Sequence, residues 1–320
     1  MSTRYTGSMQ RSGGTPGQPA GSAGSSSARG MAGVAAAEQA LSPEERAALG
    51  EAFRRTLANG VHGLCFSPYL EGQEPGSRVS EAQIRDRLAI LRPYASWVRS
   101  FSCTDGHEQT PRIAHELGLK TLVGAWLGDD REKNEREIEG LLALARAGHA
   151  DLVAVGNEVL LRGDLPEDEL IGYLERVRQA LPGVPVGYVD AYHLFEAHPN
   201  VTAACDVVLA NCYPFWEGCP RAQAVAYMQD MYRRTAAIAQ GKRVVISETG
   251  WPDKGSAFGG AVPSAEGAMR YFVDTQAWAR RDGVEVFYFA AFDEAWKVGD
   301  EGDVGAFWGL WDKHGEQKFP

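Results

Sequence analysis

Apolar and polar positions alternate in blocks along this chain, and eight of the apolar blocks have the length of a β-strand. Most of these blocks are continuous apolar runs rather than every-second-residue alternations, which is typical of parallel strands covered on both faces. The eight predicted strands span residues 61–67, 97–103, 121–126, 152–159, 185–190, 207–213, 244–248 and 284–289.

The segments between these runs carry apolar residues at helical spacing, such as Ile138, Leu141 and Ala145 at i, i+3 and i+7. Ser80 and Gln83 have the spacing of a capping box, which predicts that a helix begins there. The segment between the fifth and sixth runs is short, so we expect only a brief helix in that unit.

Eight strand-and-helix units over about 250 residues match the size of a (β/α)8 TIM barrel. A doubly wound sheet usually has fewer strands, and the first run is followed by FSPYLEG instead of a glycine-rich phosphate fingerprint. We therefore predict an α/β fold with a single (β/α)8 barrel catalytic domain at 41–320. The Ser- and Gly-rich segment 1–40 is predicted to be disordered.

The chain of 320 residues has a net charge of −10 and a pI near 5.3. This acidity argues against nucleic acid as a partner, because phosphate binding needs a basic face. No apolar run reaches the length of about 18 residues that a membrane helix needs, so no membrane span is expected. No signal peptide is recognisable, which leaves the compartment open between the cytoplasm and secretion by another route.

Cysteine and histidine do not form a metal-binding pattern in this sequence. The five cysteines are odd in number and lack a CxxC pair, so we interpret them as buried free thiols. His62, His107 and His193 lie at unrelated positions of the predicted barrel. We expect neither a metal nor any other cofactor.

Two of the apolar runs end in a glutamate. The fourth run, DLVAVGNEV, ends at Glu158, and the seventh, VVISETGWP, ends at Glu248 before a strand-breaking Gly-Trp-Pro. The carboxyl ends of barrel strands meet at one mouth, so these two side chains are expected to face each other there. Such a pair suits glycoside cleavage, in which one carboxyl protonates the leaving oxygen and the other attacks the anomeric carbon.

Further polar residues are predicted at the same mouth. Asn157, beside the acid, is placed to bind the sugar 2-hydroxyl. Arg99 and Tyr213, near the ends of the second and sixth runs, are placed to donate hydrogen bonds toward Glu248. Indole rings stack well on sugar faces, and we expect Trp251 to be the best of the candidate stacking residues, with Trp216 assigned to substrate binding too. The aromatic residues predicted at this rim are Trp126, Trp216, Trp251, Phe292, Trp296 and Trp308.

The motifs VGNEV and ISETGWP resemble the acid/base and nucleophile signatures of glycoside hydrolase family 17, which contains β-1,3-glucanases and β-1,3-glucan transglycosylases. The resemblance covers nearly everything after residue 60, from GLCFSPY through VRSFSCTDG to FAAFDEAWK and FWGLWD. It implies that Glu248 is the nucleophile and Glu158 the acid/base. It also implies a supporting carboxylate and lysine at Glu294 and Lys297, and we add Tyr69 of the first motif to the substrate-binding residues.

The sequence departs from the family pattern in the first unit. Phe66 stands where many relatives have a tyrosine, and the following loop, LEGQEPGSR, resembles the bacterial and transferase-like branch. Glu71 and Gln73 of this loop are candidates to line the donor end of the cleft. The loop after the third run, LGDDREKNE, is short and acidic, and whether the groove is open at both ends is left undecided.

These observations favour a monomeric, retaining β-1,3-glucan hydrolase, whether exo- or endo-acting. A β-1,3-glucan glucanosyltransferase would use the same residues and pass the sugar to another sugar hydroxyl instead of water. An inactive glucan-binding barrel is disfavoured by the presence of both glutamates. An aldolase or isomerase barrel would need a Schiff-base lysine or a phosphate site, and Lys297 is its only candidate.

Overall fold

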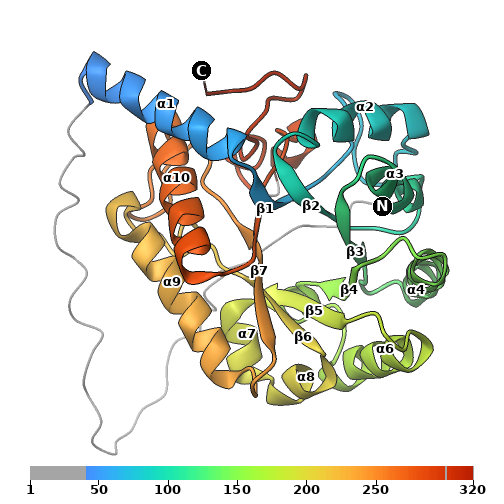
Figure 1. Ribbon diagram of the computed structural model, residues 1–320. Helices are drawn as coiled ribbons and strands as arrows, with labels where there is room; N and C mark the ends of the chain where they lie inside the picture. Colours follow the sequence, from blue (N-terminus) through green and yellow to red (C-terminus); the bar gives the residue numbers. More distant parts are fainter. Residues whose placement is uncertain (1–40, 300, 320) are drawn as a thin grey trace, which may run out of the picture.

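Eight parallel strands close into a barrel in the computed structural model, which describes residues 41–299 and 301–319 (Figure 1). The strands follow one another in chain order around the barrel, and β1 pairs with β8 to close it. This architecture confirms the predicted (β/α)8 fold. The strands are β1 Val61–Cys65, β2 Ala95–Ser100, β3 Lys120–Ala125, β4 Leu152–Asn157, β5 Val186–Ala191, β6 Val207–Asn211, β7 Arg243–Thr249 and β8 Val286–Tyr288.

The helices surround the strands on the outside of the barrel (Figure 1). Each crossover from one parallel strand to the next carries at least one helix, as parallel pairing requires. The helices of the crossovers are α2 Glu81–Leu91, α3 Thr110–Glu116, α4 Arg131–Arg146, α5 Val159–Arg162, α6 Glu167–Ala180, α7 Tyr192–Ala197, α8 Pro199–Ala204, α9 Arg221–Ile238 and α10 Ala265–Asp282. The two short helices α7 and α8 confirm the brief helical segment expected between the fifth and sixth strands.

One helix precedes the barrel. Helix α1, Pro43–Ala58, begins with a capping box in which Ser42 and Glu45 satisfy each other's backbone N–H groups. It lies beside α10, where the Phe53 ring contacts Phe272 with 5.0 Å between centroids (Figure 1). Among the described residues after β8, the one helical element is the 3₁₀ turn η2, Ala295–Lys297, and α1 packs against α10, the helix of the last crossover.

The second strand ends earlier than its apolar run predicted. Strand β2 stops at Ser100 rather than at residue 103, because the N–H of Cys103 donates to the buried carboxylate of Glu137 at 2.7 Å instead of to a neighbouring strand. The same carboxylate accepts from Ser102 Oγ at 2.6 Å and from the N–H of Trp126 at 3.0 Å. Glu137 therefore ties together the loops that leave β2 and β3 at the mouth.

The capping box predicted for α2 forms only in part. Ser80 Oγ accepts from the N–H of Gln83 at 3.2 Å. The Gln83 amide does not return to Ser80 but donates to the carbonyl of Pro68 at 2.7 Å, and it also pairs with Gln73. The prediction of a reciprocal box is thus wrong, because the glutamine fastens the loop after β1 to the helix.

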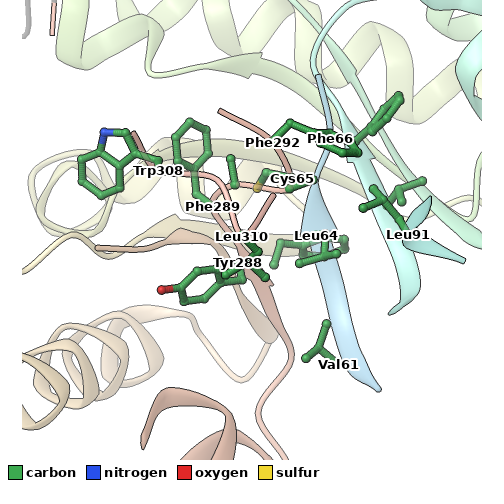
Figure 2. Packing of buried hydrophobic residues seen from close by; sticks show 14 of the residues in the cluster. Val61, Leu64, Cys65, Phe66, Leu91, Tyr288, Phe289, Phe292, Trp308 and Leu310 are labelled. Atoms are coloured by element: carbon green, nitrogen blue, oxygen red, sulfur yellow. The ribbon is translucent and has the colours of Figure 1, made fainter. Parts of the chain in front are cut away.

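Buried aromatic residues pack where the chain after β8 passes β1 (Figure 2). The Phe289 and Trp308 rings lie 6.0 Å apart, and the backbone of Ala290 exchanges hydrogen bonds with Trp308 and Leu310 at 3.0 Å. Gly309 permits this close pairing, since a Cβ there would lie 2.2 Å from the backbone nitrogen of Asp293. The FAAFDEAWK and FWGLWD segments therefore form one unit at the top of the barrel.

Candidate active site

The predicted glutamates both lie at the carboxyl ends of strands. Glu248 is the second-last residue of β7, and Glu158 follows directly after β4. Asn211 links them: it pairs in register with Glu248 between β6 and β7, and its side-chain Nδ2 donates to Glu158 Oε1 at 2.8 Å. The Asn211 Oδ1 accepts from Ser247 Oγ at 2.8 Å, which fixes the orientation of the amide. The two carboxyl groups thus share one polar cluster at the mouth.

Glu248 is buried and is held by two donors. Arg99 Nη1 contacts its Oε1, and Tyr213 Oη donates to its Oε2 at 2.7 Å, so both residues make the contact that the sequence predicted. Arg99 Nη2 also donates to Asn157 Oδ1 at 2.7 Å. Arg99 is 1% exposed and Glu248 4%. The guanidinium therefore connects the end of β4 with the end of β7.

The two donors that hold Glu248 have raised pKa values. Burial by itself would lower the pKa of Arg99, but the carboxylate of Glu248 outweighs it and the pKa stands above its ordinary value. Burial, reinforced by the same carboxylate, raises the pKa of Tyr213 far above its ordinary value. Both groups therefore keep their protons and remain hydrogen-bond donors to the Glu248 carboxyl.

The chain turns sharply after the β7 glutamate. Gly250 lies so close to the chain after β8 that a Cβ would stand 2.0 Å from the Phe289 carbonyl oxygen. Trp251 is only 1% exposed, its indole N–H donates to the Val262 carbonyl at 3.1 Å, and its ring packs edge-on against Phe215. The prediction that Trp251 stacks on sugar is therefore wrong. This tryptophan anchors the loop in the core, which explains why the strand breaks beside it.

Glu158 stands in a different setting. Its backbone is left-handed, with φ of 51°, and it directly precedes the four-residue helix α5. Asn211 is the amide donor to its carboxyl, as described above. Burial, together with the nearby carboxylates of Glu248 and Asp190, raises the pKa of Glu158 to about 7, while Asn211 and Arg162 act in the opposite direction. A carboxyl with this pKa holds a proton near neutral pH.

Arg162 fixes the end of β4 beside this acid. Its guanidinium donates to the Asn157 carbonyl at 2.5 Å and the Leu127 carbonyl at 3.0 Å, and it pairs with Asp164. It also lies over the ring of Trp126, 4.7 Å from the centroid. The amide Nδ2 of Asn157 is buried and has no hydrogen-bond partner among the described residues, which leaves a donor available to a ligand.

A second charged cluster follows β8. Lys297 Nζ lies 3.0 Å from Glu294 Oε2 and 3.7 Å from Glu301 Oε1, over the ring of Phe289. Burial raises the pKa of Glu301 to about 7, against the lowering effect of Lys297. Sequence reasoning found Glu294 and Lys297 but missed Glu301, although an acid four residues after the lysine was a usable signal.

The aromatic residues divide into exposed and buried sets. Trp216 is partly exposed, packs against Trp308 at 5.6 Å, and contacts Phe258, which is 40% exposed and was not predicted. Tyr69 is also partly exposed, and its hydroxyl hydrogen-bonds His107 Nε2 at 3.0 Å. The remaining predicted rim residues are Trp126 and Trp296, partly exposed, and Phe292 and Trp308, buried in the core.

The described part of the chain can be compared with the expectations about metals and membrane spans. Within residues 41–299 and 301–319 there is no group of three or more His, Cys, Asp or Glu side chains able to hold a metal ion. In the same part of the chain, no helix combines the length and apolar character needed to cross a bilayer. All five cysteines are buried, as interpreted from the sequence. The expected disorder of residues 1–40 lies outside the described residues.

Comparisons with known proteins agree on one family. The model of the BtgE/BtgC glycoside hydrolase domain matches residues 63–309. A glucan 1,3-beta-glucosidase of Schizosaccharomyces pombe is 28% identical over 69% of this chain and 74% of its own length. A glucan 1,3-beta-glucosidase of Saccharomyces cerevisiae is 26% identical over 83% of this chain and 93% of its own. These relatives are fungal, so the bacterial-type branch suggested by the first loop finds no support.

Solved structures point the same way. The crystal structure of a glycoside hydrolase family 17 beta-1,3-glucanosyltransferase from Rhizomucor miehei superposes with a TM-score of 0.73 at 26% identity. The match covers 82% of this chain and 96% of that one. An active-site mutant of the same enzyme, solved in complex with laminaritriose, gives the same values.

Proposed function

This chain belongs to the BtgE/BtgC glycoside hydrolase family, within glycoside hydrolase family 17, and on that basis we propose that it cleaves β-1,3-glucan with retention of configuration. The observation that carries the proposal is the contrast between the two glutamates at one mouth. Glu248 faces a guanidinium and a phenol, whereas Glu158 faces an amide and two carboxylates. This contrast supplies one ionised nucleophile and one protonated acid, as double displacement requires.

In the first step, Glu248 attacks the anomeric carbon and forms an ester with the sugar. The bond from that carbon to the glycosidic oxygen breaks, its electron pair stays on the oxygen, and Glu158 transfers its proton there. Arg99 and Tyr213 hold the attacking carboxylate in place through its two oxygens. The leaving glucan departs as a neutral alcohol.

In the second step, Glu158 acts as a base. Formation of the ester removes the negative charge of Glu248, which is one of the causes of the raised pKa of Glu158. The acid that has just lost its proton is therefore a carboxylate of lower pKa in the intermediate. It accepts a proton from the incoming hydroxyl, the new bond to the anomeric carbon forms on the face opposite the ester, and Glu248 is released.

The surrounding polar and aromatic groups are proposed to hold the glucan. The free Nδ2 of Asn157 is a donor suited to the 2-hydroxyl, a contact that strengthens as positive charge develops on the sugar. Glu294 and Lys297 offer charged partners to other hydroxyl groups, and Tyr69 and Trp216 offer partly exposed rings. All of these side chains come from one chain, which supports action as a monomer.

A glucanosyltransferase is the second candidate, favoured by the likeness to the Rhizomucor miehei enzyme. The two activities share the covalent intermediate and differ in whether water or a sugar hydroxyl accepts the glycosyl group. Incubation with laminaripentaose at rising concentrations, followed by mass spectrometry, separates them: products longer than the substrate indicate transfer, and only shorter ones indicate hydrolysis.

The same reaction, followed by NMR during the first turnovers, tests the mechanism itself. Double displacement predicts that the newly formed end appears first as the β-anomer. An α-anomer as the first product would contradict the proposed roles, and the absence of any product would support an inactive glucan-binding barrel.

A further inference from the structure

Two buried residues of β5 lie behind the acid and take no part in the reaction described above. Asp190 is 0% exposed and Tyr188 1%, and the Tyr188 hydroxyl contacts Asp190 Oδ2. The other oxygen, Asp190 Oδ1, accepts from the N–H of Ala191 at 2.8 Å. Burying a carboxylate costs folding free energy unless it is hydrogen-bonded. We therefore asked which function a fully buried carboxylate beside the active site could serve.

The pair caps the turn that carries Glu158. The first N–H groups of a helix need acceptors, and Glu158, the residue before α5, provides none because its side chain makes no cap hydrogen bond. The acceptors come from the next strand: Tyr188 Oη accepts from the N–H of Leu160 at 2.9 Å, and Asp190 Oδ2 accepts from the N–H of Leu161 at 3.4 Å. This frees the Glu158 carboxyl to point toward Asn211.

The backbone of the acid itself is held by the same strand. The N–H of Glu158 donates to the Val189 carbonyl at 2.8 Å, between the two capping residues. A left-handed conformation is unfavourable for a residue with a side chain, and it persists only where its surroundings enforce it. Three hydrogen bonds from this turn to β5 provide that enforcement.

The charge of Asp190 also acts on Glu158. The ionisable groups that act on Glu158 are Glu248 on β7, Asp190 on β5 and Arg162 on α5, and Tyr213 after β6 also interacts with its charge, while Asn211 of β6 is the neutral donor. Arg162 is occupied by Asp164 and by two backbone carbonyls. Burial raises the pKa of Asp190 to about 6, against the Tyr188 hydroxyl and the backbone donors. The negative charge of Asp190 is one of the causes that raise the pKa of Glu158.

We propose that Tyr188 and Asp190 form a positioning pair for the acid/base, which caps the turn bearing Glu158 and keeps that residue protonated through the negative charge of Asp190. The proposal rests on the proposed role of Glu158. It predicts that the pair affects the proton-transfer function of Glu158 and leaves the attack by Glu248 unchanged.

The test compares pH profiles of kcat/KM on laminaripentaose for the wild type and Asp190→Asn. Activity needs protonated Glu158, so the wild-type profile falls as pH rises through about 7. Removing the neighbouring negative charge makes ionisation of Glu158 easier, so the falling limb of Asp190→Asn is expected to move to lower pH by about one unit. Glu137→Gln is the matched control, because it removes an equally buried carboxylate on α4 and should leave the limb in place.

A second variant covers the case in which Asp190→Asn does not fold. Tyr188→Phe removes only the capping hydroxyl, and it is expected to lower kcat/KM on laminaripentaose about tenfold, a part of what general acid catalysis contributes. Its kcat/KM on a 2,4-dinitrophenyl β-laminaribioside, which reports only a first step whose leaving group needs no proton, should stay close to wild type. Equal losses of kcat/KM on the two substrates in Tyr188→Phe would overturn the proposal. So would a falling limb in the pH profile of Asp190→Asn that stays at the wild-type pH.

The failure of this inference is distinguishable from the failure of the proposed function. If Glu158→Gln loses kcat/KM equally on both substrates, Glu158 is not the acid and the proposed function fails with it. If Glu158→Gln spares the dinitrophenyl substrate while Asp190→Asn keeps the wild-type limb, only the positioning pair is refuted.

Discussion

The β4 side and the β7 side of the barrel mouth present the same side chain in opposite surroundings. On the β7 side, Glu248 sits within the strand, where the pairing of β7 with β6 and β8 shifts register, and it receives a guanidinium and a phenol hydroxyl. On the β4 side, Glu158 sits beyond the strand in a left-handed turn and receives an amide, with carboxylates nearby. Both residues are glutamates, so the groups that surround each carboxyl are what distinguishes the roles proposed for them.

The backbone accounts for part of this difference. Glu248 belongs to β7 and pairs with Asn211 of β6, so the strand sets the direction of its side chain. Its carboxyl then needs only hydrogen-bond donors within reach. Glu158 lies outside the ladder, and its direction depends on the turn that follows, which β5 holds through Val189, Tyr188 and Asp190. Glu248 is therefore placed by the sheet, and Glu158 by a cap from its neighbour strand.

The largest effect on activity is expected from removing Glu248, the proposed nucleophile. Glu248→Ala removes the attacking group, and kcat is expected to fall by about 10⁴-fold or more, as for other removed nucleophiles. Added azide or formate should partly restore turnover of a dinitrophenyl laminaribioside, with the product in the α-configuration seen by NMR. Glu158→Ala with azide is the matched control and should give the β-azide. A β-product from Glu248→Ala would remove Glu248 from the nucleophile role.

The next effect is expected on the acid side. Glu158→Gln keeps the shape of the side chain but cannot donate the proton, so kcat/KM on laminaripentaose should fall by about 10²–10⁴-fold. The burst of dinitrophenolate from an activated laminaribioside should remain, because its leaving group departs without a proton. A loss of the burst as large as the loss on laminaripentaose would contradict the assignment.

A smaller effect on kcat/KM is expected from changing Arg99, which contacts Glu248. Arg99→Lys keeps a positive charge near Glu248 but loses the planar fork that also reaches Asn157. We expect kcat/KM to fall about 10²-fold on natural and activated substrates alike, since the attack by Glu248 is part of the first step with both. Arg87→Lys, at another buried arginine that lies over Phe292, is the control and should change thermal stability more than kcat/KM. A loss confined to laminaripentaose would place Arg99 on the acid side.

The smallest effect concerns the two tryptophans of the β7 side. Trp216→Ala removes a partly exposed ring, and KM for laminaripentaose should rise about fivefold, the equivalent of roughly 1 kcal/mol of ring contact. Trp251→Ala empties a core site instead and should lower the free energy of unfolding by about 3 kcal/mol or more. Denaturant melts with KM measurements on both variants check this, and the reverse pattern would contradict the assignment of Trp251 to the core.

The sequence was informative where local pattern and chain order decide the outcome. Continuous apolar runs marked all eight strands, and the position of Glu158 and Glu248 at the ends of two runs brought them to one mouth, as the barrel requires. The contacts of Arg99 and Tyr213 with Glu248 were predicted for the same reason, since both residues lie near the carboxyl ends of their strands.

Other features depend on contacts between distant segments. Trp251 follows the nucleophile by three residues, but its burial comes from a loop that returns to place the Val262 carbonyl on its indole. The cap on Glu158 comes from Tyr188 and Asp190, some thirty residues away on the next strand. Helix α1 and Glu301 had local signals, a capping box and an i+4 acid, that were not used.

The most direct test of the central claim, that Glu248 forms the covalent bond to sugar, is to trap the intermediate. A 2-deoxy-2-fluoro-β-laminaribiosyl fluoride should inactivate the enzyme with time and add the mass of one fluorodisaccharide. Peptide mapping by tandem mass spectrometry is predicted to find the label on Glu248. A label on Glu158 or on any other residue would contradict the account.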